Sequence, residues 1–384
     1  MVYYILTVLI GVALDFWGGS SKSAGLTRKC FVIWLYVFLC FGYMTGSDWR
    51  TYEMQFMYMN NISDLGWLNE VGFNFLFFAL KKVLSDYWLV VGVLKCLYLY
   101  TLIRVAKIIT PHWLAVISLM ITGNLSFMLI DNPLRFMTAL VLVNMALELC
   151  LKNKIVPAFL LVFLSFFMHN TSIFYLLLIP CVLFAERIAQ WNKVLLAIIY
   201  VFVLYIGSNV QIIEFMRQSM ISVLINLSED VRTYSTYEAT SNASFFSLGN
   251  IFGIMMFLVI LLTRDLIIWK HENGKMVYSM AIINAMLSKL LIIIPTGFRL
   301  AIPFSIFYIV YMVYLLRSTS LLKWFFVGYI SISFPLNLWT TYKYIPYSNS
   351  IPYILTGHID YNTRSRYNIN AYEKRTGRTY NGDF

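Results

Sequence analysis

About twelve apolar segments, most of them 15 to 20 residues long, follow one another along this chain of 384 residues. Apolar runs of this length suit membrane-crossing helices, whereas a membrane β-barrel would show alternating segments of roughly 10 residues. Only 12% of the residues are charged, against about 25% in soluble domains. The sequence therefore predicts an all-α, polytopic helical membrane protein with about 11–12 transmembrane helices. The expected spans are 2–17, 31–45, 87–103, 112–130, 133–151, 154–168, 171–185, 193–208, 247–263, 276–294, 298–316 and 322–340.

One further segment, from Glu70 to Leu84, has helical periodicity but carries polar residues. Its apolar side chains share one face, and Asn74, Lys81 and Lys82 lie off that face. Such a pattern is typical of an amphipathic helix that lies in the membrane interface rather than crossing it. The apolar face consists of Phe73, Leu76, Phe77, Leu80, Val83 and Leu84.

The charges of the connecting segments predict which of them share a side of the membrane. Fourteen basic and three acidic residues fall in 18–30, 104–111, 152–154, 186–193, 264–275 and 317–323. Seven basic and ten acidic residues fall in the alternate set, 46–86, 131–135, 209–246 and 295–299. Because Lys and Arg are enriched in cytoplasmic loops, we expect the first set inside and the second outside. The two long outward loops, 46–86 and 209–246, are large enough to build a site above the bilayer.

The C-terminal segment does not follow this charge rule. We expect one integral membrane domain over 1–341, followed by a polar basic tail, 342–384. After Thr340 the chain has six basic and three acidic residues, yet twelve spans would place the tail outside. Two explanations stay open: the tail is translocated despite its charge, or a short pair of segments, such as 154–168 and 171–185, is re-entrant.

Several classes of function lack support in the sequence. The net charge of +11 is scattered over short loops, which does not favour nucleic-acid binding. The five cysteines lie in or beside apolar runs without metal spacing, so neither a disulfide nor a metal site is expected. The first apolar run lacks the flanks of a cleavable signal peptide. We find no nucleotide-binding loop and no hydrolase or kinase motif, and we expect no cofactor.

Four short polar interruptions carry arginine or histidine, and the charge pattern places all four on the outward side. They are 46–50, 131–135, 169–172 and 296–299. Ionisable groups near bilayer depth are costly, so they usually have a function. In the first interruption, Asp48 is a candidate base and Arg50 a candidate phosphate ligand, although a polar loop cap would look the same.

The other interruptions supply cations and a histidine. Arg135 and Arg299 each begin a span, and the planar guanidinium suits bidentate binding of pyrophosphate; a snorkelling role is the alternative for Arg135. His169 is the one histidine with apolar runs on both sides, and it could donate to a phosphate or move a proton. Its alternative is a structural group at a helix end.

Two more ionisable residues belong to the predicted site. Glu70 precedes the amphipathic helix and is a candidate base, the alternative being a helix cap. Lys289 lies within a span, about two turns from its outer end, from where it could extend towards the site.

The order of these motifs resembles the EpsG-like family of exopolysaccharide and O-antigen polymerases, the Wzy-type proteins, over about residues 40–310. Three elements differ from the family. Val71-Gly72-Phe73 follows Glu70 where the family usually has Pro-Gly-Tyr, and Phe136 follows Arg135 where it usually has Gln. His169 is followed by Asn170-Thr171 in place of the commoner Pro-Ser. The matching elements are Gly46-x-Asp48-x-x-x-Tyr52, Asn69-Glu70-x-Gly72-Phe73, Asn132-x-x-Arg135, Phe167-x-His169-x-x-Ser172 and Phe298-Arg299-Leu300.

The resemblance implies a GT-C-like polymerase that joins undecaprenyl-pyrophosphate-linked oligosaccharide repeat units at the outer face of the bacterial inner membrane. On this interpretation Asp48, Glu70 or His169 acts as the acid–base group. The pyrophosphate and sugars would be bound by Arg50, Tyr52, Arg135, Lys289 and Arg299, with help from the loop 209–246. Membrane lipids and a chain-length regulator are the other expected partners.

Two other classes of protein would also carry cations near a membrane surface. A flippase or other transporter of lipid-linked oligosaccharide is one alternative, but the internal repeats typical of transporters are missing. A membrane O-acyltransferase with His169 as its base is the other, although the set of arginines favours a pyrophosphate over a thioester.

Overall fold

The computed structural model describes residues 2–18, 22–45, 48–61, 70–131, 133–225, 245–291, 297–318, 331 and 347–376. Within these ranges the regular structure is helical, and the strand-like pairing is one isolated antiparallel bridge between Gly42 and Asn349. The predicted all-α class is therefore confirmed. The expected span 322–340, apart from Ser331, and half of the predicted sugar-binding loop 209–246, namely residues 226–244, lie outside the described residues.

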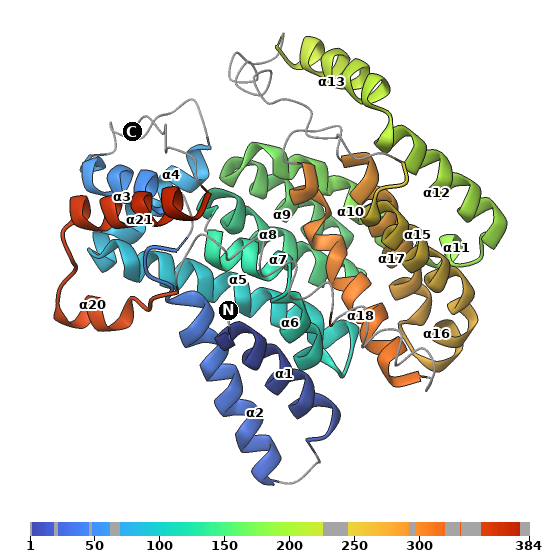
Figure 1. The fold of residues 1–384 in the computed structure, drawn as a ribbon, viewed down its shortest axis with the longest axis horizontal. Coiled ribbons are helices and arrows are strands. Elements are labelled where there is room, and N and C mark those ends of the chain that lie inside the picture. The colour runs from blue at the N-terminus through green and yellow to red at the C-terminus, as the bar shows by residue number, and fades with distance from the viewer. Residues whose placement is uncertain are drawn as a thin grey trace. The chain divides into compact units, whose positions relative to one another are not determined.

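The chain divides into two compact units, each traced by its colours in Figure 1. Unit 1 combines Met1–Leu176 with Thr319–Phe384, and unit 2 comprises Leu177–Ser318. The C-terminal tail therefore belongs to the same unit as the first half of the chain.

Unit 1 is built around α5 (Tyr87–Ile109), most of whose residues are buried. Asp86 caps this helix by accepting a hydrogen bond from the backbone N–H of Leu89 at 2.8 Å, which satisfies one of the donors that a helix start leaves free. Helices α8 (Leu134–Leu151) and α9 (Ile155–Met168) follow α5 in the core. The other elements are α1 (Val2–Phe16), α2 (Lys22–Leu35), η1 (Tyr36–Cys40), α3 (Trp49–Tyr58), α4 (Val71–Leu84), α6 (Trp113–Met120), α7 (Asn124–Ser126), η3 (Phe127–Asp131), η4 (Asn170–Leu177), α20 (Ile351–Thr356) and α21 (Tyr361–Thr376).

Unit 2 has α17 (Gly274–Leu290) and α18 (Ile302–Ser318) at its centre. Their packing includes the buried Tyr278 and Tyr311, and the hydroxyls of Tyr311 and Thr263 hydrogen-bond at 2.7 Å. The remaining elements are α10 (Leu178–Leu183), α11 (Ala185–Ile188), α12 (Lys193–Ser208), α13 (Val210–Ile225), α15 (Leu248–Leu262), α16 (Arg264–Lys270) and η7 (Gly297–Ala301).

The helices support a polytopic membrane protein. Among the described residues, three helices are long and apolar enough to cross a bilayer, and up to six spans result if each strongly bent pair counts as one. The expected span 112–130, for example, is bent by 67° between α6 and the segment 124–130. Large apolar side chains such as Val156, Phe159, Leu160 and Phe163 are exposed along α9, as expected of a helix that faces lipid.

The predicted amphipathic helix is confirmed as α4, and its polar residues pack against α3. The ammonium of Lys81 donates to the backbone oxygens of Phe56 and Met57, and Lys82 donates to the backbone oxygen of Asn60 at 3.1 Å. These carbonyls lie at the end of α3, where a helix leaves acceptors without intrahelical partners. The two lysines therefore join α3 and α4 into one hairpin of the loop 46–86.

The C-terminal tail packs on this same loop. Arg364 of α21 forms a buried two-bond ion pair with Glu53 of α3, and His358 bonds Asp86 at 2.6 Å. Figure 1 shows α21 beside α3. The tail and the loop 46–86 therefore lie at the same end of unit 1, as translocation of the tail together with that loop would require.

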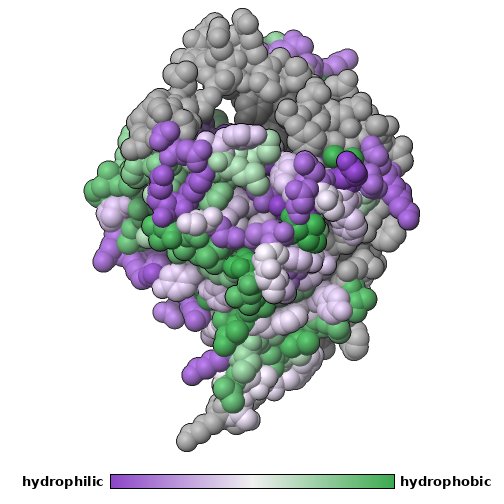
Figure 2. Space-filling model, turned by 90° about the vertical axis from the view of Figure 1, so that its left-hand side faces the viewer, coloured by the Kyte–Doolittle hydropathy of each residue, from purple (hydrophilic) through white to green (hydrophobic). Residues whose placement is uncertain are grey.

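The face of unit 1 that carries these elements differs in polarity along its height. Hydrophilic residues lie across the middle of this face, interleaved with hydrophobic ones, and hydrophobic residues predominate in the lower part, towards α2 (Figure 2). An extended hydrophobic surface of this kind is expected where a membrane protein contacts lipid.

Candidate active site

Glu70 occupies the centre of a polar cluster in unit 1. It directly precedes α4 with φ 51° and ψ 47°, a left-handed conformation that is uncommon for residues other than glycine. Its side chain is only 8% exposed and makes no capping bond to the helix that it precedes. The capping role considered from the sequence does not fit, and the strained backbone turns the carboxylate towards other segments.

Arg135 and His169 hold the two oxygens of this carboxylate. Arg135 Nη1 donates to Glu70 Oε2 at 3.0 Å, and His169 Nδ1 bonds Glu70 Oε1. Arg135 lies in the first turn of α8, and His169 ends α9. Three residues predicted separately as site residues thus meet at the Glu70 carboxylate: Arg135 and His169 come from two polar interruptions of the chain, and Glu70 precedes the amphipathic helix.

Aromatic rings fix the orientation of the two basic side chains. The Arg135 guanidinium carbon lies 5.8 Å from the ring centroids of both Tyr52 and Phe73. The ring of Phe136 meets that of His169 edge to face, with centroids 5.4 Å apart. Arg135 keeps 35% of its side chain exposed, so a held guanidinium still presents a surface to a ligand.

Two amides that the sequence analysis did not select complete the cluster. Gln55 of α3 donates to the buried Asn74 of α4 at 3.1 Å, and its oxygen lies 3.5 Å from Arg135 Nη2. Gln55 lies one helical turn after Tyr52, so both side chains point from α3 towards Arg135. That spacing is the only sequence signal that could have identified it.

The charges of the cluster keep Glu70 ionised. Burial opposes ionisation, but the contacts of the carboxylate with His169 and with the Arg135 guanidinium outweigh it, so the pKa of Glu70 falls below its usual range. Burial raises the pKa of the Tyr52 phenol to about 12, despite the nearby Arg135 charge. At neutral pH the site therefore contains a carboxylate, a guanidinium and a neutral phenol.

Asp48 and Arg50 lie at the start of α3, close to this cluster in sequence but with different surroundings. Asp48 is the half-buried residue before the helix, and its charge acts on the Tyr52 phenol. Arg50 is buried, with 3% of its surface exposed. Such burial argues against Arg50 as a direct phosphate ligand in this conformation and suits a role in holding its loop.

Lys289 and Arg299 belong to unit 2. Lys289 donates to Asn250 at 2.9 Å, and Asn250 donates in turn to Ser208 at 3.1 Å. Arg299 is half-buried in η7. Their expected role in pyrophosphate binding stays a prediction. Within the part of the chain that the structure describes, no three His, Cys, Asp or Glu side chains form a group suited to a metal ion.

Gly72 lets α4 approach α9 closely next to the cluster. A Cβ atom at this position would lie 2.9 Å from the backbone oxygen of Phe167. We expect Gly72→Ala to force the helices apart at a cost of about 1–3 kcal/mol, separating Glu70 from His169 and lowering the free energy of unfolding. Gly25→Ala is the matched control, because nothing lies within 4 Å of its added Cβ. Equal free energies of unfolding for the two variants, measured in mixed micelles, would contradict this role.

The comparison with protein families agrees with the motifs. The model described as the EpsG family matches residues 26–354, most of the chain, including every residue of the cluster. No curated protein and no solved structure matches the chain.

Proposed function

The chain belongs to the EpsG family, and from this membership we propose that it is a glycosyltransferase that polymerises lipid-linked oligosaccharide repeat units. The family supports a membrane polymerase of the exopolysaccharide or O-antigen type. In our proposal the donor and acceptor are both carried on undecaprenyl pyrophosphate. The reaction takes place at the outer face of the bacterial inner membrane, on the side that the charge pattern predicts for the loop 46–86.

The contact among Glu70, Arg135 and His169 carries the proposal. A donor glycan on a lipid pyrophosphate presents two features at headgroup level: an anionic leaving group and an anomeric carbon. The cluster offers a partly exposed guanidinium for the anion and a carboxylate–imidazole pair for proton transfer. Both functions come from segments that the charges of the loops predict on one side.

The proposed step is a substitution at the anomeric carbon of the donor. A hydroxyl oxygen of the acceptor sugar forms the new bond to that carbon as the bond from the carbon to the pyrophosphate oxygen breaks. The pyrophosphate leaves with the electron pair, and Arg135 stabilises its growing charge. The hydroxyl proton passes to a base of the protein.

His169 suits the role of this base better than Glu70 does. A carboxylate with a lowered pKa, bonded on both oxygens, is a weak proton acceptor near neutral pH. The same carboxylate orients the imidazole through Nδ1, so proton exchange with the substrate falls to Nε2. We therefore assign Glu70 to hold His169 and Arg135, and His169 to take the proton.

A deletion strain complemented with variants of the gene tests the function. Loss of a polymerase leaves lipid carriers capped by single repeat units outside the membrane, whereas loss of a flippase leaves them inside. We expect the strain that carries His169→Gln to accumulate the exported single units. The control variant is His112→Gln, which changes a histidine paired with Asp15 and should restore long chains. Long chains from His169→Gln at normal protein level would exclude the proton-transfer role. If the deletion strain retains the single repeat units on the inner side of the membrane, the protein is not the polymerase.

A further inference from the structure

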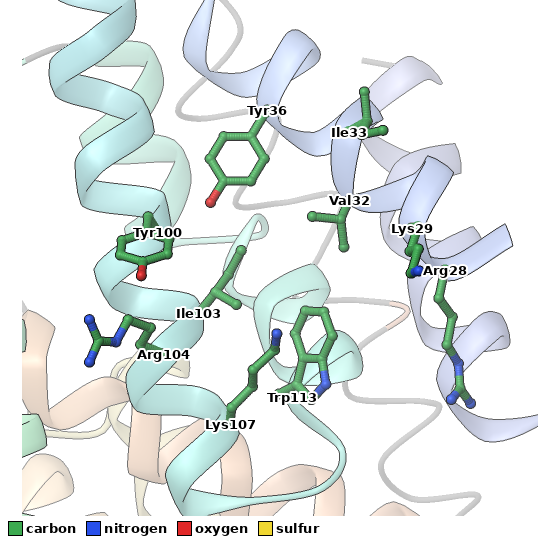
Figure 3. Close-up of a pocket in the computed structure, with 10 residues that line it drawn as sticks. All are labelled: Arg28, Lys29, Val32, Ile33, Tyr36, Tyr100, Ile103, Arg104, Lys107 and Trp113. Atoms are coloured by element: carbon green, nitrogen blue, oxygen red, sulfur yellow. The ribbon is translucent and has the colours of Figure 1, made fainter. Parts of the chain in front are cut away.

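A cavity of about 480 Å³ lies between α2, α5 and α6 of unit 1, away from the Glu70 cluster. Figure 3 shows its lining: basic side chains at one end, and Tyr36 and Tyr100 towards the other. Four cations line it, Arg28 and Lys29 from α2 and Arg104 and Lys107 from α5. A hollow with one charged end and one aromatic and aliphatic end matches an amphiphile rather than a compact polar molecule.

The helical spacing produces this polarity. On α5, Tyr100, Ile103, Arg104 and Lys107 fall on one face, because residues three, four and seven apart share a side of a helix. The cations lie towards the end of α5 and near the middle of α2. The cavity therefore runs along the helices, as an acyl chain in a bilayer does.

The carboxylates near the cavity neutralise only part of its charge. Glu148 bonds Arg104 at 2.5 Å but also bonds Lys152 at 2.7 Å, so one negative charge serves two cations. Asp15, near Trp113, pairs with His112 at 3.5 Å. Arg28 donates to the backbone oxygens of Leu14 and Gly18, which orient its guanidinium without cancelling its charge.

The other two cations are placed to meet a ligand. The Lys107 ammonium stands 4.5 Å from the Trp113 ring centroid, and both Lys29 and Lys107 are exposed. Basic pockets between membrane helices on the cytoplasmic side recognise anionic lipid headgroups. The loops that carry these residues, 18–30 and 104–111, are those that the charge pattern predicts in the cytoplasm.

We propose that this cavity binds an anionic phospholipid of the inner leaflet. Its phosphodiester lies among Arg28, Lys29, Arg104 and Lys107, and an acyl chain follows Ile33 and Tyr36. α5 starts beside α3, where the Tyr87 hydroxyl donates to the backbone oxygen of Trp49, and it rises about 30 Å from there to Lys107 at the cavity. The lipid is therefore a bound partner at the opposite end of unit 1 from the proposed reaction, and its binding does not depend on the proposed function.

The purified full-length protein in detergent tests the site through native mass spectrometry with added phosphatidylglycerol. We expect the double variant Lys29→Gln/Lys107→Gln to bind the lipid about thirtyfold more weakly, since each basic residue near a lipid surface contributes about fivefold. Lys29→Arg/Lys107→Arg keeps both charges and should bind as the wild type does. The matched control is Lys270→Gln/Lys275→Gln, which removes two exposed lysines of another predicted cytoplasmic loop, 264–275.

Three results would overturn the proposal: equal phosphatidylglycerol binding by the Lys29→Gln/Lys107→Gln protein and the wild type, an equal loss in the 270/275 control, or equal binding of phosphatidylcholine. A further arm adds glycerol phosphate at the same concentration. Displacement of phosphatidylglycerol by this soluble headgroup would assign the cavity to a soluble phosphate compound instead of a lipid.

Discussion

Replacing Arg135 by alanine is expected to reduce the rate of polymer formation at least about a hundredfold. The guanidinium is held by Glu70 and by the rings of Tyr52 and Phe73, so in the proposed reaction it would meet the developing charge of the leaving group without reorganising. Removing one such preorganised donor costs about 10²–10³ in rate. The measurement is the initial rate of chain growth from lipid-linked repeat units in proteoliposomes, at equal amounts of folded protein.

Two further variants separate charge from geometry in this result. Arg135→Lys keeps the positive charge but loses the planar fork, so we expect it to recover only a small part of the rate. Arg366→Ala removes an exposed arginine of α21 in the same unit and should leave the rate unchanged. If Arg135→Ala makes long chains at the normal rate, Arg135 does not act on the pyrophosphate.

The charged centre of the site was predictable because membrane burial makes ionisable residues conspicuous. Glu70, Arg135 and His169 each stand next to a long apolar run, and the charge pattern places them on one side. The structure adds their direct contact. It also changes their roles, because a carboxylate bonded on both oxygens is better suited to holding its two partners in place than to accepting a proton. The pattern of residue types along the chain does not predict that both oxygens of Glu70 are bonded.

Gln55 and Asn74 were not predictable for a different reason. The hydrophobic pattern of a helix does not predict whether a neutral amide is buried or exposed. Asn74, in addition, lies off the apolar face of α4. Its burial depends on α3 folding back onto α4, which the lysines at the end of α4 stabilise. The periodicity of one helix predicts its own faces and does not predict which neighbour covers the polar one.

The tail shows the limit of the charge rule. The charge rule counts Arg364 as a free cation, which argues against an external position of the tail. In the structure, however, Arg364 is buried against Glu53, a residue 311 positions away. The rule counts Lys and Arg along the chain and takes no account of the ion pairs that they form in the folded protein. The family match ends at residue 354, before Arg364, so neither topology rules nor motifs pointed to this contact.

Breaking the pair between Glu53 and Arg364 is expected to destabilise unit 1 by about 3–5 kcal/mol, because one buried charge then lacks its partner. Both side chains are at most 5% exposed, and two bonds of 2.8 and 2.9 Å join them. The rings of Tyr43, Trp49, Trp88 and Tyr361 surround the guanidinium within 6 Å of their centroids. The measurement is the free energy of unfolding of Arg364→Met in mixed micelles.

The same variant should also slow polymer formation, since α3 carries Glu53 together with Tyr52 and Gln55, which contact Arg135. A loosened tail lets α3 shift and removes two supports of the guanidinium.

Glu53→Met/Arg364→Met replaces both charges by apolar side chains and should recover most of the stability, since an apolar pair of similar volume is often as stable as a buried ion pair. Arg366→Ala is again the control. Unchanged stability in Arg364→Met would show that the tail does not hold α3, and a double variant as unstable as the single one would mean that the rings, not the charges, carry the contact.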